Sequence, residues 1–317
     1  MNNPVQHRYD FVYLFDVVDG NPNGDPDAGN LPRADAETGQ GLVTDVCLKR
    51  KVRNYVGLAR GEAPGYRIFI KEKAVLNSLI EEAYSQSESV KAALQSWQAW
   101  KKNKQNPKPE RHYEDVACDW LCENFYDIRG FGAVLTTGDE KEVGEVKSKI
   151  KMTAGQVRGP LQLTMARSVS PIVSAEFAIT RCAVTNEKDE EKERTFGRKF
   201  AVPYGLYKGF GYINATLAKR TGFGDDDLEL FKHALNMMFE ADRSAARGLM
   251  SPVRCIAFRH EKELGNARAD QLFARVNVKL RDELAHDARP PRSREDYVIS
   301  VATTDLPNGI TVEEWVQ

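Results

Sequence analysis

Alternating hydrophobic positions near the N-terminus predict a strand that is covered on both faces. Within residues 8–18, the apolar side chains of one face are Tyr9, Phe11, Tyr13, Phe15 and Val17. The other face carries Val12, Leu14 and Val18, together with Asp10 and Asp16. Because successive side chains of a strand point to opposite sides, this pattern requires a packing layer on each side.

A long turn-rich loop follows this strand and leads into an amphipathic helix. Residues 19–41 read DGNPNGDPDAGNLPRADAETGQG, and their Gly, Pro, Asn and Asp content opposes regular structure. Thr44 is placed to cap the helix DVCLKRKVRNYV. The apolar stripe of this helix is Leu48, Val52, Tyr55 and Val56. Loops of this length in compact domains are usually functional or disordered, so the loop deserves a chemical interpretation.

The remaining pattern predicts an α+β fold of the split βαβ, ferredoxin-like class with large insertions. Residues 72–126 are mostly helical and form an insertion. Strands are predicted at 127–135, 156–166, 172–184, from Tyr204 onward, near 254–259 and at 297–303, with a charged hairpin-like stretch at 185–199. A helix is predicted from about Asp226 to Arg247, with Asp225 near its cap and Gly248 as its stop signal.

The sequence of one predicted strand matches a nucleic-acid-binding signature. Residues 208–215 read KGFGYINA and match the basic-Gly-aromatic-Gly-aromatic pattern of an RNA-recognition strand up to Ala215. Residues 12–17 resemble its shorter partner, but the two lie almost 200 residues apart. Patterns of Gly, aromatic and aliphatic residues are common in strands, so the favoured interpretation is that Phe210 and Tyr212 pack in the core.

Composition bears on whether the protein binds nucleic acid and on the cellular compartment in which it works. The 317 residues carry 45 basic and 46 acidic side chains, so the net charge of −1 does not by itself indicate a nucleic-acid binder, although a local basic patch would suffice. The five cysteines are irregularly spaced and predict reduced thiols in a cytoplasmic protein. The N-terminus has no apolar signal core, and no apolar run reaches the ~18 residues that span a membrane.

Three interpretations of these residues involve a metal site, and each has a purely structural alternative. Asp19, Asn21, Asn23 and Gly24 match the start of a calcium loop, but Asn30 stands where a bidentate Glu is required. Asp16, Asp19, Asp25 and Asp27 would be the carboxylates of a two-metal nuclease. Cys118 and Cys122, with His112 nearby, lack a fourth zinc ligand. The favoured interpretation is a loop whose Asp and Asn side chains bond its own backbone, and neither a metal nor another cofactor is expected.

The start of the helix after the loop is a better chemical signal. Lys49, Arg50, Lys51 and Arg53 follow a Gly-rich loop and a Thr cap. Helix N-termini bind phosphate groups through free backbone N–H groups, and neighbouring cations strengthen that binding. A solvated charged helix flank is the alternative that composition leaves open.

The stretch from Phe15 to Arg53, FDVVDGNPNGDPDAGNLPRADAETGQGLVTDVCLKRKVR, resembles the repeating backbone subunit of type I CRISPR Cascade complexes, subtype I-C, of the RAMP superfamily. Further matches are DIRGFGAV, GQVRGPLQ, GRKFAVPYGLY, GFGDDDLELF and DRSAARG, which together cover most of the chain. The resemblance implies a modified RNA-recognition fold shaped like a hand. Its palm would be residues 1–65, 127–184 and 205–317, its helical fingers about 66–126 and its thumb about 185–204.

The resemblance also implies a mechanism and site residues. Copies of the chain would stack head to tail along one CRISPR RNA, kink it periodically and present it for pairing with target DNA. Guide phosphates would be held first by Lys49 and Arg53, with Arg50 and Lys51 beside them and Asn21, Asn23 and Arg33 from the loop. Weaker candidates are Gln156, Arg158 and Arg167 in the palm and Arg198, Lys199 and Tyr204 at the thumb.

The partners implied are the CRISPR RNA, target DNA through the guide, further copies of the chain, and the cap, large and small subunits of Cascade. A recruited helicase-nuclease would be an indirect partner, and no membrane is involved. The resemblance implies a non-catalytic subunit. The rival hypothesis is a metal-dependent RNA endonuclease of a type III-like complex, using one of the loop carboxylates.

Overall fold

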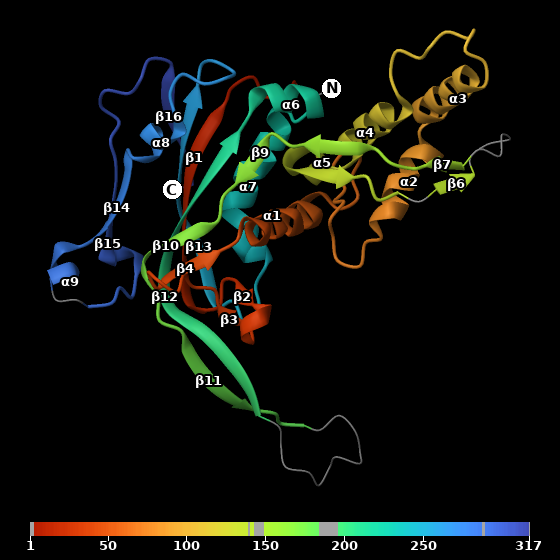
Figure 1. Cartoon of the computed structure of the whole chain (residues 1–317). Helices are drawn as coiled ribbons and strands as arrows, with labels where there is room; N and C mark the ends of the chain where they lie inside the picture. The colour runs from red at the N-terminus through yellow and green to blue at the C-terminus, as the bar shows by residue number, and fades with distance from the viewer. Residues whose placement is uncertain (1–2, 139, 143–148, 184–195, 287–288, 317) are drawn as a thin grey trace.

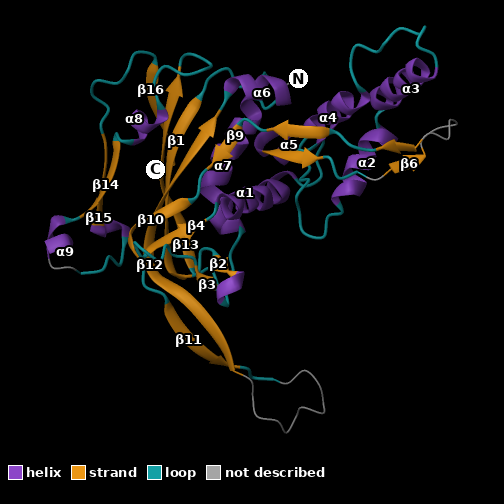
Figure 2. Cartoon of the chain, viewed as in Figure 1, coloured by secondary structure: helices purple, strands orange, loops and turns teal. Residues whose placement is uncertain are grey.

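An eight-stranded antiparallel sheet forms the centre of the protein. The computed structural model describes residues 3–138, 140–142, 149–183, 196–286 and 289–316. Along the sheet the strands are β16 (Ile310–Val316), β13 (Leu249–His260), β1 (Tyr9–Gly20), β12 (Phe196–Ile213), β10 (Ala166–Pro171) and β4 (Gln40–Val43). β9 (Leu161–Leu163) and β11 (Ala175–Thr180) pair with the two ends of the long strand β12. Figure 2 shows most of the helices on one side of these strands, with the short helices α8 (Ala269–Phe273) and α9 (Asp282–His286) on the other side.

Both faces of β1 are covered, as its alternation predicts. Phe11 and Phe15 belong to a core shared with α1 (Asp45–Arg60) and α7 (Asp225–Ala241). Val12 and Leu14 belong to a second core on the opposite face, shared with α8 (Ala269–Phe273), β14 (Val276–Leu280) and β15 (Tyr297–Val301). The fold is therefore a mixed α and β structure built on an antiparallel sheet.

α1 forms where the capping signal predicts it. Thr44 Oγ1 accepts a hydrogen bond from Cys47 N at 3.2 Å, and Asp45 adds negative charge to the first turn. Leu48, Val52 and Val56 are buried in the first core. The helix ends at Arg60, and Gly61 follows with a positive φ of 57°.

A helical arm extends from one side of the sheet (Figure 1). We use this name for α2 (Leu76–Gln86), α3 (Glu88–Lys102), α4 (Tyr113–Asn124), β6 (Glu140–Glu142) and β7 (Lys149–Lys151). The arm has its own core, which includes Ile80, Leu94 and Leu121. α5 (Tyr126–Phe131), β5 (Gly132–Leu135) and β8 (Gly155–Arg158) connect the arm to the body.

Several predicted boundaries are wrong. Residues 126–131 form helix α5, and only Gly132–Leu135 are a strand, because Gly132 ends the helix with a φ of 85°. The predicted strand 156–166 is divided into β8 and β9 and reaches the first residue of β10. Within the described part of the predicted strand 172–184, only Ala175–Thr180 form a strand, β11. β12 ends at Ile213, because Asn214 caps the helix α6 (Ala215–Thr221).

The limits of α7 also differ from the prediction. Asp225 is its first residue rather than its cap, because Asp227 accepts a hydrogen bond from Gly224 N at 2.9 Å. The helix ends at Ala241, six residues before Arg247. There Asp242 is bound by Lys51 and by Arg247, at 2.5 and 2.7 Å, and Gly248 turns the chain with a φ of 60°.

A two-stranded projection leaves the sheet at the start of β12. Residues Ala175–Thr180 of β11 pair with Phe196–Ala201 of β12, and the pair points away from the body (Figure 1). Most of the charged stretch predicted as a hairpin, residues 184–195, lies outside the described residues.

The remaining elements are short and lie in loops or at the sheet edges. They are β2 (Gly24–Asp25), a 3-10 helix at Pro26–Ala28, β3 (Leu31–Pro32), α9 (Asp282–His286) and a 3-10 helix at Arg294–Asp296. Among the described residues, no helix combines the length and apolar character needed to cross a membrane.

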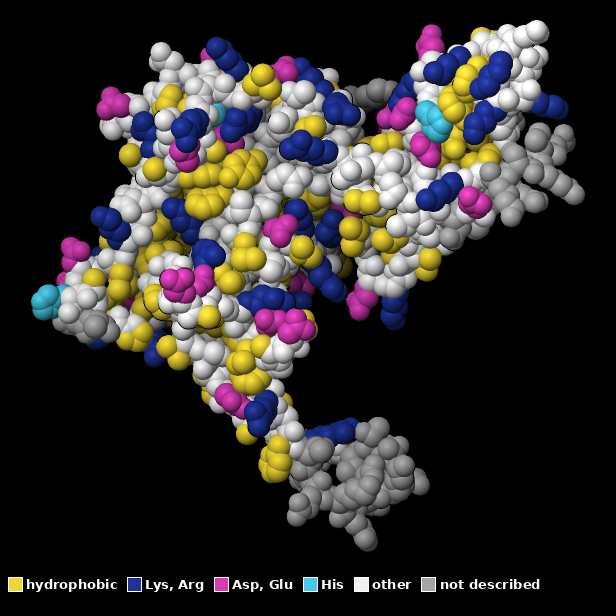
Figure 3. All heavy atoms as spheres, in the orientation of Figure 1, with side chains coloured by type: hydrophobic (Ala, Val, Ile, Leu, Met, Phe, Trp, Pro, Cys, Tyr) yellow, Lys and Arg dark blue, Asp and Glu magenta, His cyan; other side chains and the backbone are white. Residues whose placement is uncertain are grey.

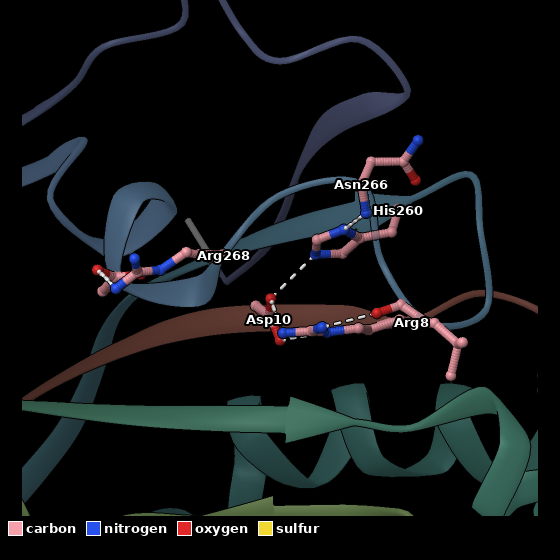
Figure 4. A network of polar contacts seen from close by, with 7 residues as sticks. Arg8, Asp10, His260, Asn266 and Arg268 are labelled. Carbon is pink, nitrogen blue, oxygen red and sulfur yellow. Dashed lines mark hydrogen bonds and ion pairs between the residues drawn. The ribbon is translucent and has the colours of Figure 1, made fainter.

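A buried polar network fixes the start of β1 (Figure 4). Asp10 and His260 are both fully buried, with His260 Nε2 2.9 Å from Asp10 Oδ2. Asn266 N donates to His260 Nδ1 at 2.8 Å, so His260 carries its proton on Nε2 and donates it to the carboxylate. Arg8 closes the network with a 2.9 Å contact to Asp10. The burial of both groups gives this pair a structural role.

Candidate nucleic-acid interface

The loop after β1 is anchored to the start of α1. Asn23 Oδ1 accepts hydrogen bonds from the backbone N and the side-chain hydroxyl of Thr44, each at 3.0 Å. Asn21 Nδ2 donates to the carbonyl of Asn30 at 2.7 Å, while Asn21 Oδ1 is buried without a hydrogen-bond partner. The two loop amides thus hold the loop around the helix N-terminus. We call residues 21–43 with the first two turns of α1 the loop–α1 surface.

The loop carboxylates do not converge on a metal. Asp16 is buried on the sheet face opposite α1, where Arg294 contacts it at 3.1 Å and Tyr204 donates to it at 3.4 Å. Burial raises the pKa of Asp16 against the opposing effect of Arg294. Among the described residues, no group of three or more His, Cys, Asp or Glu side chains could hold a metal ion. This geometry does not favour the two-metal and calcium interpretations.

The cysteine pair on α4 is equally unlike a zinc site. All five cysteines are free thiols, and Cys122 is buried in the core of the arm. His112 caps α4 through Nδ1, which accepts from Glu114 N at 3.3 Å, and its ring packs on Trp97. The histidine is therefore engaged in local structure.

The four cations of α1 have different environments. Arg50 is exposed, whereas Lys49 is mostly covered and lies 3.1 Å from Asp45 and 3.5 Å from Gln162 Oε1. Lys51 and Arg53 are only 2% and 8% exposed. Lys51 pairs with Asp242 at 2.5 Å, and Arg53 pairs with Asp127 at 2.8 Å. Only the first two cations are thus available to an external phosphate.

Arg53 is part of a buried junction between α1 and the arm. Its Nε lies 2.8 Å from Oδ2 of Asp127, and its guanidinium lies over the ring of Phe131. The same carboxylate accepts the backbone N–H groups of Phe69 and Ile70, at 2.8 and 3.0 Å. Because Arg53 and Asp127 are both buried, the junction is structural, and direct RNA contact by Arg53 would require it to open.

A second buried junction lies beside the first and was missed in the sequence. Arg129 makes a bidentate contact with Asp227, at 2.9 and 2.7 Å, and also donates to the carbonyls of Cys122 and Gly65. Asp227, the third carboxylate of the run Asp225–Asp227, is only 2% exposed and therefore does not contribute a surface charge.

Arg33 belongs to the loop–α1 surface, and Arg167 lies beside it on β10. The carbonyl of Arg33 accepts from Leu42 N at 2.8 Å, and Leu42 is the register partner of Arg167 across β4 and β10. Arg33 contacts Asp25 at 3.4 Å and Arg167 contacts Asp35 at 2.7 Å. The hydrogen bond from Arg167 lowers the pKa of Asp35 to about 2. Figure 3 shows Lys and Arg side chains interspersed with carboxylates over this part of the molecule.

Gln156 and Arg158 are exposed on β8, at the base of the arm. They line a polar cavity of about 460 Å³ that also contains Arg111, Arg220 and Thr221. Gln162, which sequence reasoning did not select, links this region to α1, because its Nε2 donates to Gly159 O at 3.0 Å while its Oε1 faces Lys49.

The residues expected at the thumb are separated. Arg198 is 74% exposed on the β11–β12 projection and pairs with Glu176, and Lys199 lies next to it on the same strand. Tyr204 is 5% exposed, and burial raises the pKa of its phenol well above the ordinary range. The assignment of Tyr204 to direct RNA contact conflicts with this burial.

The aromatic residues of KGFGYINA pack within the protein. Phe210 stacks on Phe273 of α8 with ring centroids 4.6 Å apart, and Tyr212 contacts the same ring at 5.7 Å. The Lys208 ammonium donates to the carbonyl of Val276 at 2.8 Å. The face of β12 that carries these two rings is therefore covered by C-terminal elements.

Comparison with known proteins identifies the family. The family model for CRISPR-associated protein Cas7 matches residues 7–302, so the chain belongs to the Cas7 family. A curated relative, the CRISPR-associated protein Cas7 of Haloferax volcanii, is 24% identical over 228 residues. The alignment covers 70% of this chain and 61% of that relative, so this chain corresponds to less than two thirds of its length.

Two solved chains are similar at lower identity. A chain described as "CRISPR RNA-guided surveillance complex, pre-nicking" is 13% identical, with a TM-score of 0.47 over 79% of this chain and 78% of that one. A chain described as "CRISPR RNA-guided surveillance complex" is also 13% identical, with a TM-score of 0.39 over 79% of this chain and 68% of that one.

Proposed function

We propose that this protein is a non-catalytic RNA-binding backbone subunit of a CRISPR surveillance complex, of the type I-C Cascade kind. The observation that carries the proposal is the anchored loop–α1 surface within a member of the Cas7 family. Copies of the chain stack head to tail along one guide RNA, kink it at intervals and present its bases to target DNA. The cap, large and small subunits complete the particle, which recruits a helicase-nuclease.

The topology supports a palm of the RNA-recognition type. The order β13–β1–β12–β10, with α1 after β1 and α7 between β12 and β13, is the 4-1-3-2 order of a ferredoxin-like sheet. In this proposal residues 1–65, 127–184 and 205–317 are the palm and about 66–126 the fingers. The β11–β12 projection carries the thumb, about 185–204, part of which lies outside the described residues.

The exposed cations bind the guide directly, and the buried ones support them. Phosphates are held by Arg50, Lys49, Arg33 and Arg167, and by Gln156 and Arg158 at the base of the arm. Arg198 and Lys199 act from the projection. Lys51, Arg53 and Asn23 fix the position of α1 and the loop, as their contacts with Asp242, Asp127 and Thr44 support. Asn21 helps to fix the loop, as its hydrogen bond to the carbonyl of Asn30 supports.

The first experiment purifies the chain with its neighbouring subunits and a CRISPR array, and sequences the RNA that survives a high-salt wash. A single spacer-containing species of defined length is expected. Heterogeneous or absent RNA in a wild-type particle would contradict the proposal.

The loop–α1 surface is tested by replacing Lys49 and Arg50 together with Ala. Loss of two phosphate contacts lowers the slope of log affinity against log salt by about 1.4, independently of spacer sequence. A matched control replaces Lys262 and Lys279, two exposed lysines on other elements. Equal guide retention by both double variants would show that the loop–α1 surface does not bind the guide.

A further inference from the structure

The end of the helical arm concentrates positive charge that the proposed guide site does not use. Residues 91–111 contain the six cations Lys91, Lys101, Lys102, Lys104, Lys108 and Arg111, but only the carboxylate of Glu110. The chain as a whole has a net charge of −1. We call α3 from Trp97 onward, residues 103–112 and the first turn of α4 the arm tip.

Four of these cations have no carboxylate partner. Lys91 pairs with Glu88 and Arg111 with Asp119, both at 2.7 Å. The other four of these six cations, Lys101, Lys102, Lys104 and Lys108, are exposed and form no ion pair with a described residue. Figure 3 shows Lys and Arg side chains on both sides of an apolar strip at the end of the arm, at the upper right of the view. This arrangement leaves a cationic surface open to a ligand.

Aromatic rings lie between these lysines. Trp97 and Trp100 have centroids 4.9 Å apart, and Trp97 also contacts the rings of His112 and Tyr113. The ammonium groups of Lys104 and Lys108 lie 3.2 and 5.7 Å from the centroid of the Trp100 ring. The ring attracts both cations, but the two repel each other. An anion bound between them would relieve that repulsion.

A cavity of about 750 Å³ opens beside these rings, within the size range of sites for small organic groups. Its lining includes the apolar side chains of Leu94, Trp97 and Tyr113 together with Lys101 and Lys102 of the arm tip. Lys151 and the carboxylate of Glu140 also line it. Apolar side chains together with ammonium groups match a nucleotide, which has an apolar base face and an anionic phosphate.

We propose that the arm tip is a second nucleic-acid site, which binds a single-stranded segment other than the guide. A base enters the cavity against Trp97, and the flanking phosphates contact the four unpaired lysines. Aromatic rings alternating with cations are the recognition chemistry of single strands, because every base has a stacking face. A duplex would present its phosphates but would keep its bases out of the cavity.

This site is physically separate from the loop–α1 surface. Its residues belong to elements packed on the core of the arm, whereas α1 packs on the core of the sheet. Figure 1 places α3 at the far end of the arm from α1. Changes at Trp97 and at the four unpaired lysines therefore leave the loop–α1 surface intact, which makes the two proposals separable.

The test uses the guide-loaded complex and two fluorescent homopolymers that cannot pair with the guide, oligo-dT and oligo-rU. The Lys101→Ala, Lys102→Ala, Lys104→Ala, Lys108→Ala variant should bind both with a log–log salt slope lower by about 3. Trp97→Leu should weaken binding about tenfold, while Trp97→Phe keeps a stacking face and most of the affinity. The Lys262→Ala, Lys279→Ala pair is the control, and extracted guide RNA is quantified for every variant.

Unchanged homopolymer binding by the lysine variant overturns the proposal. So does loss of guide from that variant, which would assign the arm tip to the guide path. A lysine-dependent preference for duplex over single strands overturns the single-strand assignment. Stronger binding of oligo-dT than of oligo-rU identifies DNA as the source of the segment, and the reverse identifies RNA. If the wild-type complex contains no guide, the proposed function fails, while homopolymer binding by the full-length chain still tests the arm tip.

Discussion

The Nε atom of Arg53 lies 2.8 Å from Oδ2 of Asp127, joining the helix after the first loop to the segment that leads out of the arm. Both side chains are buried, and Asp127 also accepts two backbone N–H groups. Arg53, which lies on the helix expected to bind phosphate, is thus already paired with a carboxylate of the protein. Its replacement will alter folding and RNA binding together, so the two effects have to be measured separately.

Replacing Arg53 with Ala is expected to lower the free energy of unfolding by about 3 kcal/mol, because Asp127 is left as a buried charge without its ion pair. Arg50→Ala, on the exposed side of the same helix, should change it by less than about 0.5 kcal/mol. Urea denaturation of the purified chain measures both. Equal stability of the two variants would show that the pair is not a structural junction.

The exposed ion pair Arg167–Asp35 predicts a change in guide binding, not in folding stability. Asp35 competes with guide phosphates for Arg167, 2.7 Å away. Asp35→Asn removes this negative charge but keeps an oxygen that accepts from Glu37 N and Thr38 N. The salt concentration that releases half of the guide should rise in Asp35→Asn and fall in Arg167→Gln.

The control for this prediction is another exposed pair, Arg268–Asp270 on α8, whose groups lie 2.8 Å apart. Asp270→Asn should leave guide release unchanged. If it raises salt resistance as much as Asp35→Asn does, the effect reflects total charge, and Arg167 is not a local phosphate contact.

Local signals in the sequence predicted local structure well. The alternation of β1 predicted its two covered faces, and Thr44 predicted the start of α1, because both depend on residues within a few positions. The prediction of a strand at residues 127–131 was wrong because the conformation of this segment depends on distant partners. Arg53 and Asp127 are 74 positions apart, and Arg129 and Asp227 are 98 apart.

The same limit applies to the candidate site. Four cations in one helical segment indicate phosphate binding, but the sequence does not reveal which of them faces a carboxylate. Lys51 contacts Asp242, which is 191 positions away in the sequence, and the lysine is buried in this contact. Gln162 was missed because a lone glutamine beside a strand carries no pattern, although it contacts Lys49 in the fold.

The strand KGFGYINA supports a prediction that separates packing from recognition. Phe210 stacks on Phe273, so Phe210→Ala should destabilise the fold by about 2 kcal/mol, less than a fully buried Phe because its ring is half-buried. Phe210→Leu retains most of the apolar area and should cost less. Neither change should alter the salt dependence of guide retention in folded complexes. A large loss of guide from a stably folded Phe210→Leu complex would show instead that this ring stacks on a base.

Asp16 provides a pH-dependent prediction, because burial raises its pKa despite Arg294 and Tyr204. The unfolded chain releases this proton near pH 3.9, whereas the folded chain retains it to a higher pH. The carboxyl group's contribution to stability is therefore greatest below pH 3.9 and is lost as pH rises through the folded-state pKa. In Asp16→Asn the group cannot titrate, so the stability of the variant relative to wild type should increase from about pH 4 toward neutrality. Urea midpoints measured across this range test the prediction, since other titrating groups cancel in the difference. A difference independent of pH would mean that Asp16 is solvated as an ordinary surface carboxylate, and would reopen its assignment as a metal ligand.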